Sequence, residues 1–197
     1  MKRTPAGKLA AGFTLAACLV LAAAPRAGAQ APSLTNFQQV TADPPILTPA
    51  TAPCTETVIT HDFGNSYYAP ATGALTPPAN CSGPWSKVVL SLSASVGGVQ
   101  FDRIADVYVG AANVFSTSTS EPCCTPNATV SWTWQKDVTE FAPLFAAPQT
   151  VTVFLNNVND STYTGVYHVV VTLDFYPADA NNAAASHPDA IAPLSEL

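Results

Sequence analysis

The sequence predicts an all-β protein whose main body is one antiparallel, jelly-roll-like β-sandwich. Beyond residue 55 the chain alternates between segments rich in Val, Thr, Tyr, Phe and Leu and short clusters of Pro, Gly and Asn. The first composition favours strands and the second favours turns. After residue 29, no stretch sustains a helical period over several turns. Six or more strands with connections of this length predict two packed sheets, and the jelly-roll is the preferred arrangement.

Six strands are expected, at residues 57–63, 85–96, 104–109, 130–137, 150–156 and 166–176. Residues 137–145 are compatible with one short turn of helix. Alternation is clearest in the last strand, where every second residue from Tyr167 to Phe175 is apolar and the opposite face is mixed. Because successive strand residues point to opposite faces, the apolar face should pack in the core.

The N-terminus has the pattern of an export signal. Lys2, Arg3 and Lys8 precede an apolar run over residues 9–24, and small residues at 27–29 form a cleavage pattern. We expect a signal peptide over residues 1–29, cleaved near Ala29-Gln30, and a secreted or periplasmic protein. Cys18 permits a second interpretation, lipoprotein anchoring, which the apolar residues after it disfavour.

The remaining chain divides into three parts by composition. Residues 30–52, rich in Pro, Thr and Ala, predict an extended leader. Residues 53–178 carry the strand pattern, and residues 179–197 predict a flexible tail or a truncated connection to a further domain. After the signal, no segment approaches the length of a membrane span.

Charge disfavours one class of partner. Of the seven basic residues, four lie within residues 1–29, so three remain against thirteen acidic residues and the formal net charge changes from −6 to −10. A surface of that sign repels a phosphate backbone, and we expect no nucleic-acid binding.

Four cysteines remain after residue 29: Cys54, Cys81, Cys123 and Cys124. In an exported chain an even number indicates disulfides, and four cysteines allow three pairings. Adjacent Cys123 and Cys124 would form a strained ring with each other, so separate pairing of each with Cys54 or Cys81 is favoured. The spacing of cysteines and histidines matches no metal motif, and no metal or cofactor is expected.

Asp102 and Arg103 are the first candidates for a functional site, because a charged pair beside an apolar strand must be paired, strained or used. A catalytic acid with its orienting cation and a structural ion pair are both consistent with the pattern, and composition favours the ion pair. Glu121 is a further carboxylate candidate for the same cleft. Tyr68, in a polar loop, is a candidate aromatic platform for a ligand.

Several segments occur in one order and spacing: Pro53-Cys54, Trp85-Ser86-Lys87-Val88-Val89-Leu90, Gln100-Phe101-Asp102-Arg103-Ile104, Thr119-Ser120-Glu121-Pro122, Lys136-Asp137-Val138-Thr139, the run from Ser161 to His168, and Phe175-Tyr176-Pro177. Together they resemble the N-terminal domain of the peptide-N4-(N-acetyl-β-D-glucosaminyl)asparagine amidase A family, the acid-active glycoamidases. The resemblance covers residues 53–177.

The resemblance implies hydrolysis of the amide between asparagine and the first N-acetylglucosamine of an N-glycan. It implies that Asp102 is the catalytic carboxylate and that Arg103 holds the glycan core. Bacterial relatives carry a glutamate where this chain has Asn156 or Asn157, and Asn156 is taken as a substrate-binding residue. Family enzymes have two β-sandwich domains, so a second domain is an expected partner. The alternative is a non-catalytic module that binds N-glycans.

Overall fold

The structure is a computed structural model that describes residues 45–77, 79–120 and 129–192. Within these ranges the chain forms eight strands: β1 (Cys54–Phe63), β2 (Ala71–Leu75), β3 (Trp85–Gly97), β4 (Ile104–Val109), β5 (Ala112–Ser118), β6 (Thr129–Asp137), β7 (Gln149–Leu155) and β8 (Val166–Pro177). The predicted signal peptide, Cys18 and most of the predicted leader lie outside the described residues.

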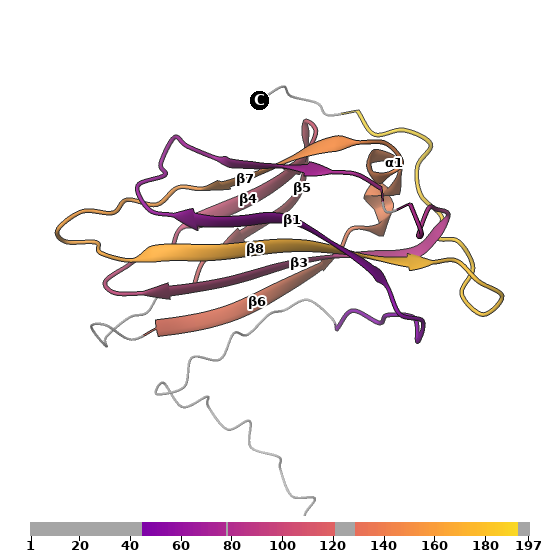
Figure 1. Ribbon diagram of the computed structural model, residues 1–197, viewed down its shortest axis with the longest axis horizontal. Coiled ribbons are helices and arrows are strands. Elements are labelled where there is room, and N and C mark those ends of the chain that lie inside the picture. Colours follow the sequence, from indigo (N-terminus) through magenta and orange to yellow (C-terminus); the bar gives the residue numbers. More distant parts are fainter. Residues whose placement is uncertain (1–44, 78, 121–128, 193–197) are drawn as a thin grey trace, which may run out of the picture. The chain divides into compact units, whose positions relative to one another are not determined.

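The strands form two four-stranded antiparallel sheets, in the orders β1-β8-β3-β6 and β2-β7-β4-β5. The two sheets face each other as a sandwich (Figure 1). Strands adjacent in sequence mostly lie in different sheets, and this wrapping of eight strands is the jelly-roll order. The predicted fold class is confirmed.

The core lies between the sheets. In β8, Tyr167, Val169, Val171, Leu173 and Phe175 are buried, as the alternation predicts. They pack with buried side chains of the second sheet such as Val107, Val153 and Leu155. Full burial of one such side chain contributes roughly 1.5–3 kcal/mol. This core fixes the relative position of the two sheets and therefore of the loops at their ends.

Two strands, β2 and β5, were not predicted. The sequence of β2, Ala-Thr-Gly-Ala-Leu, has one β-branched residue and therefore a low strand propensity. Its pairing with β7 supplies the stability that this propensity lacks. The hairpin between β4 and β5 turns at Gly110 and Ala111, where Gly110 adopts a φ of 59°. A positive φ is easily reached by glycine and suits the two-residue turns of hairpins.

Cys54 and Cys81 form a disulfide that joins the start of β1 to the segment before β3. The indole N–H of Trp85 donates to the Cys81 carbonyl oxygen at 2.7 Å, and its ring lies 4.9 Å from that of Phe175. The favoured pairing, in which Cys123 and Cys124 each bond to Cys54 or Cys81, is therefore wrong. Cys123 and Cys124 themselves lie outside the described residues.

The expected helical turn follows β6, as the 3₁₀ helix η1 (Thr139–Phe141) and the short helix α1 (Ala142–Phe145). Asp137 accepts hydrogen bonds from the backbone N–H and the hydroxyl of Thr139, and from Lys87 on β3. Burial by itself raises the pKa of Asp137, but the hydrogen bonds from Lys87 and Thr139 outweigh it and hold the pKa below its usual value.

Part of the C-terminal segment contacts the sandwich. The backbone N–H groups of Ala178 and Ala185 donate to the carbonyl oxygens of Pro84 and Trp85. Asp179 accepts from the backbone N–H groups of Asn181 and Asn182 in a turn. These contacts lie beside the start of β3, at one end of the sheets.

Candidate functional site

Three described connections lie at the opposite end of the sandwich, called here the loop end. They join β1 to β2, β3 to β4 and β7 to β8, and the end of β5 lies beside them. The strand register places them together, because Phe63 at the end of β1 pairs with Tyr167, Gly97 at the end of β3 pairs with Val166, and Ala105 pairs with Leu155. The loop end is on the left in Figure 1. Each of these three connections crosses from one sheet to the other.

Asp102 lies at the loop end, in the connection that leads into β4, and its side chain is exposed. Its Oδ2 accepts a hydrogen bond from the hydroxyl of Ser118, the last residue of β5, at 3.4 Å. The neighbouring Phe101 is 48% exposed. The carboxylate is therefore accessible to a ligand and is not covered by packed apolar groups.

Arg103 does not form an ion pair with Asp102. Among the described residues, Lys87 forms an ion pair with Asp137, and a hydrogen bond joins His168 Nδ1 to the Asp62 carboxylate. The structural ion pair that composition favoured is thus absent from the described part of the chain. The backbone of Arg103 is instead fixed by Thr119, whose hydroxyl accepts the Arg103 N–H at 2.7 Å and whose N–H donates to the Arg103 carbonyl oxygen at 2.7 Å.

The Arg103 guanidinium is bound by two amide side chains and lies over one aromatic ring. Its Nε donates to Asn157 Oδ1 at 3.3 Å and its Nη2 donates to Gln100 Oε1 at 2.9 Å. Its Cζ is 5.5 Å from the centroid of the Tyr163 ring, within the range of a cation–π interaction. Gln100, Asn157 and Tyr163 are named here the Arg103 cradle.

Exposed apolar side chains gather at the loop end. The structure has six large apolar residues with high exposure among those it describes, and five belong to this end: Tyr67, Tyr68, Val99, Phe101 and Ile104. Tyr67 and Tyr68 pack edge to face with ring centroids 4.8 Å apart, and Tyr68 is 91% exposed. Rigid aromatic faces of this kind suit contact with a sugar ring or with another protein surface.

The predicted site residues are only partly brought together. Asp102, Arg103, Tyr68 and Asn156 all lie at the loop end, where the Asn156 N–H donates to the Ile104 carbonyl oxygen at 3.4 Å. Glu121 lies outside the described residues. The Asp137-Val138-Thr139 segment, part of the resemblance, lies toward the opposite end, where it holds the turn after β6.

Sequence reasoning missed Ser118, Gln100 and Tyr163 as neighbours of the charged pair. The available signal for Gln100 was its place in the same short segment as Asp102. Ser118 and Tyr163 are separated from Asp102 and Arg103 by long stretches of chain, so only the fold shows their proximity.

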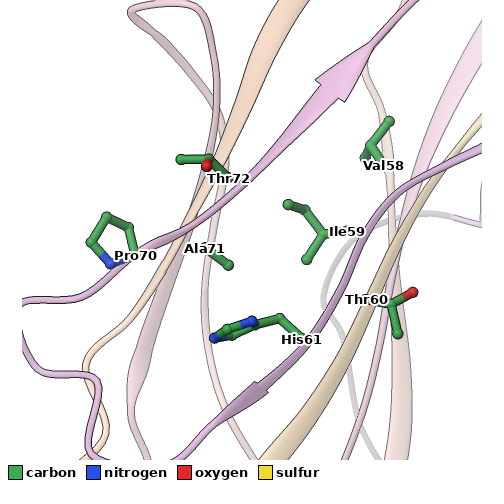
Figure 2. Close-up of a pocket in the computed structure, with 7 residues that line it drawn as sticks. All are labelled: Val58, Ile59, Thr60, His61, Pro70, Ala71 and Thr72. Carbon is green, nitrogen blue, oxygen red and sulfur yellow. The ribbon is translucent and has the colours of Figure 1, made fainter.

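A hollow of about 380 Å³ lies elsewhere, along the side of the sandwich where the edge strands β1 and β2 approach. Figure 2 shows the residues that line it, with Ile59 and His61 projecting from β1 toward β2. The His61 ring packs edge to face on Phe63 at 4.7 Å. This hollow contains none of the predicted site residues.

In the described ranges, no group of three or more His, Cys, Asp or Glu side chains is arranged to hold a metal ion. In the same ranges, no helix has the length and apolar character needed to cross a membrane.

The fold and the site define a jelly-roll β-sandwich with an accessible carboxylate and a fixed arginine among its crossing loops. The chain belongs to the peptide N-acetyl-beta-D-glucosaminyl asparaginase amidase A family, whose model matches residues 41–197. It is 42% identical over 146 residues to the peptide-N4-(N-acetyl-beta-glucosaminyl)asparagine amidase A of Prunus dulcis. That match covers 73% of this chain and 25% of the relative, so the chain spans about a quarter of the relative's length.

Solved structures show a weaker likeness. The VP2 subviral particle of infectious bursal disease virus has 8% sequence identity and a TM-score of 0.33, covering 76% of this chain and 39% of that one. The T13 particle of the same virus has 7% identity and a TM-score of 0.31, covering 75% and 37%. At these values the likeness carries no inference about function.

Proposed function

We propose that this chain is the N-terminal domain of an exported glycoamidase, which hydrolyses the amide bond between asparagine and the first N-acetylglucosamine of an N-glycan. The observation that carries the proposal is the position of Asp102, exposed at the loop end beside Arg103 and bonded by Ser118. Membership of the family and the printed name of the Prunus dulcis relative support the choice of bond.

The chemistry fits a positioned carboxylate. Water adds to the carbonyl carbon of the asparagine side chain, the carbon–nitrogen bond breaks, and the nitrogen leaves with the sugar as a glycosylamine after gaining a proton. The peptide keeps an aspartate. In this proposal Asp102 orients the water and exchanges protons with the reacting groups, a task for which a carboxylate within hydrogen-bonding reach is suited.

The glycan would be held by the groups around Asp102. Arg103 donates charge-assisted hydrogen bonds to sugar oxygens, and Tyr68 presents an aromatic face for stacking. Asn156 and Glu121 complete the proposed substrate-binding set. No cofactor enters this scheme.

We also propose that a second β-sandwich domain covers the loop end and completes the site. The support is twofold: the chain matches about a quarter of the relative's length, and five exposed apolar side chains lie at the loop end that carries Asp102. Clusters of this kind are typical of surfaces that bind a partner or a ligand. Alone, the chain would then bind the glycan and release the aspartyl peptide, but more slowly than a protein with both domains.

The test uses a denatured N-glycopeptide at mildly acidic pH with the wild-type chain, Asp102→Asn and Asp106→Asn. Asp106, on β4, is the matched control, because its carboxylate accepts from Ser116 on the sheet and is outside the loop end. We expect glycopeptide binding by all three proteins, and release of an aspartyl peptide only where Asp102 is intact.

Binding without release in the wild type would favour the alternative, a non-catalytic N-glycan-binding module, which the exposed tyrosines also support. Release that persists in Asp102→Asn, or a wild-type chain with no affinity for the glycopeptide, would contradict the proposal.

A further inference from the structure

Arg103 is held in a way that sequence does not reveal, by neutral acceptors and an aromatic ring. We propose that the Arg103 cradle is a positioning assembly, which fixes the guanidinium at the loop end with its positive charge intact for a ligand bound beside Asp102. The use of that position for a glycan rests on the proposed function. The fixation of Arg103 does not.

Backbone carbonyl oxygens fix the orientation of the two amides. The NH₂ groups of Gln100 and Asn157 both donate to the Gly165 carbonyl oxygen, at 2.8 and 3.1 Å. Asn157 donates in addition to the Phe63 carbonyl oxygen at 3.0 Å, and Gln100 to that of Val158 at 3.3 Å. A carbonyl oxygen accepts and never donates, so the NH₂ groups must face it and the amide oxygens must face Arg103.

Both amides are buried. Asn157 is 0% exposed and Gln100 is 4% exposed, so neither amide can replace a lost partner with water. A buried polar side chain whose donors and acceptor are all engaged is costly to rearrange. Asn157 also ties together the connections after β1, before β4 and after β7, through Phe63, Arg103 and its own backbone. The two amide oxygens therefore present a rigid pair of acceptors.

A turn in the β7–β8 connection positions the Tyr163 ring. Asp160 accepts the backbone N–H groups of Thr162 and Tyr163 at 2.7 and 2.8 Å, forming the turn that carries Tyr163. The Tyr163 ring then packs on Phe101 at 5.2 Å and lies over Arg103. The guanidinium is thus restrained by hydrogen bonds in its plane and by a ring against it.

The cradle has a chemical consequence. A carboxylate in place of either amide group would form an ion pair with Arg103 and neutralise its charge. It would also repel the backbone carbonyl oxygens that now accept hydrogen bonds from the NH₂ groups. The two amides fix the orientation of the Arg103 guanidinium without neutralising its positive charge. A planar, charged donor in a fixed place suits a ligand rich in acceptor oxygens, such as the hydroxyl and acetamido groups of N-acetylglucosamine.

The test begins with the wild-type chain labelled with ¹⁵N-arginine. Arg103→Lys identifies the Arg103 Nε–H signal, because that signal disappears. We expect this N–H to exchange with water at least about tenfold more slowly than in free arginine, because Asn157 accepts it. Exchange at the rate of free arginine would overturn the proposal.

Gln100→Met removes the amide at similar size, and Gln135→Met is the matched control. Gln135 is exposed on β6 and donates to Ser91, away from the loop end. We expect Gln100→Met to accelerate the exchange of the Arg103 N–H and to weaken binding of N,N′-diacetylchitobiose about tenfold. Gln135→Met should change neither. An unchanged Arg103 signal in folded Gln100→Met would refute the cradle.

Tyr163→Leu provides a second route if Gln100→Met does not fold, because it leaves both buried amides in place. It should weaken diacetylchitobiose binding about threefold and broaden the distribution of Arg103 conformers. Unchanged affinity and signal would count against the ring's role. A protected Arg103 signal in a wild-type chain that does not bind diacetylchitobiose would support the cradle and refute the proposed function, so the two failures are distinguishable.

Discussion

The hydroxyl of Tyr167 donates a hydrogen bond to the carbonyl oxygen of Phe101 at 2.7 Å, and so joins the core of β8 to the residue that precedes Asp102. The same hydroxyl accepts from Thr119 at 3.2 Å, and Thr119 in turn fixes the backbone of Arg103. Tyr167 is fully buried. The backbone on both sides of the candidate carboxylate is therefore anchored to one core side chain.

Tyr167→Phe should test that anchor. The change removes one hydroxyl and keeps the ring, so the Phe101 carbonyl oxygen loses its partner and the free energy of unfolding should fall by about 1 kcal/mol. Urea denaturation measures this loss. Tyr68→Phe, at an exposed ring, is the control and should leave the stability unchanged. Equal stability of the Tyr167→Phe protein and the wild type would show that the bond is not needed.

Gly73 permits the close approach of the two edge strands. A Cβ at this position would clash with the backbone oxygen of Val58, which leaves no space for a side chain. Gly73→Ala should therefore force β2 away from β1 and destabilise the protein by about 1–3 kcal/mol.

Gly64→Ala is the matched control for Gly73→Ala, since a Cβ at Gly64 would meet nothing within 4 Å. The melting temperatures of the two variants should differ clearly, with that of Gly64→Ala close to the wild-type value. Similar melting temperatures for both would contradict the close packing of β1 and β2.

The Cys54–Cys81 disulfide closes a segment of 27 residues that includes β1 and β2. By the chain-entropy estimate, closing a loop of this size stabilises a fold by about 3.5 kcal/mol. The double variant Cys54→Ala/Cys81→Ala should lose stability of this order in urea denaturation without reductant. Adding reductant should destabilise the wild type. The double variant lacks this disulfide, so its stability should not fall further through loss of this bond. A double variant as stable as the oxidised wild type would refute this contribution.

The lowered pKa of Asp137 predicts that the stability of the folded protein depends on pH. Its pKa in the folded protein lies below its value in the unfolded chain, so the unfolded state binds the proton more readily. The contribution is complete above the unfolded pKa, near 3.9, and is lost as the pH falls through the folded pKa.

Asp137→Asn should consequently cost about 0.5–1 kcal/mol at pH 7, because the pair with Lys87 is partly exposed. The difference from the wild type should shrink as the solution is acidified below pH 4. Urea denaturation at several pH values measures it, with the exposed Asp189→Asn as the control for charge. A difference that grows on acidification would have the wrong sign.

Much of the fold was predictable because its strands carry local signals. The expected strand at residues 104–109 coincides with β4, and those at 85–96 and 166–176 end within one residue of β3 and β8. Alternation in β8 also identified the core face. β2 and β5 were missed because small and polar residues dominate them, and their pairing with neighbours supplies the stability that their sequences lack.

The site was predictable only at its two adjacent charges. Asp102 and Arg103 are consecutive, so a linear sequence shows them together. Arg103 and Asn157 are 54 residues apart, and their contact depends on how the β3–β4 and β7–β8 connections meet. Amide side chains are also common in turns, so a buried, positioning amide has no distinctive sequence pattern.

The crossing of the three described loop-end connections from one sheet to the other has a consequence for sensitivity to heat and denaturant. Arg103 directly precedes β4 of one sheet, while Tyr163 lies shortly before β8 of the other sheet. A slight sliding of one layer over its partner would shift these groups relative to one another before any strand separates. Loss of ligand recognition should thus precede global unfolding. Mutations in the core between the two sheets should also change the geometry of the loop end.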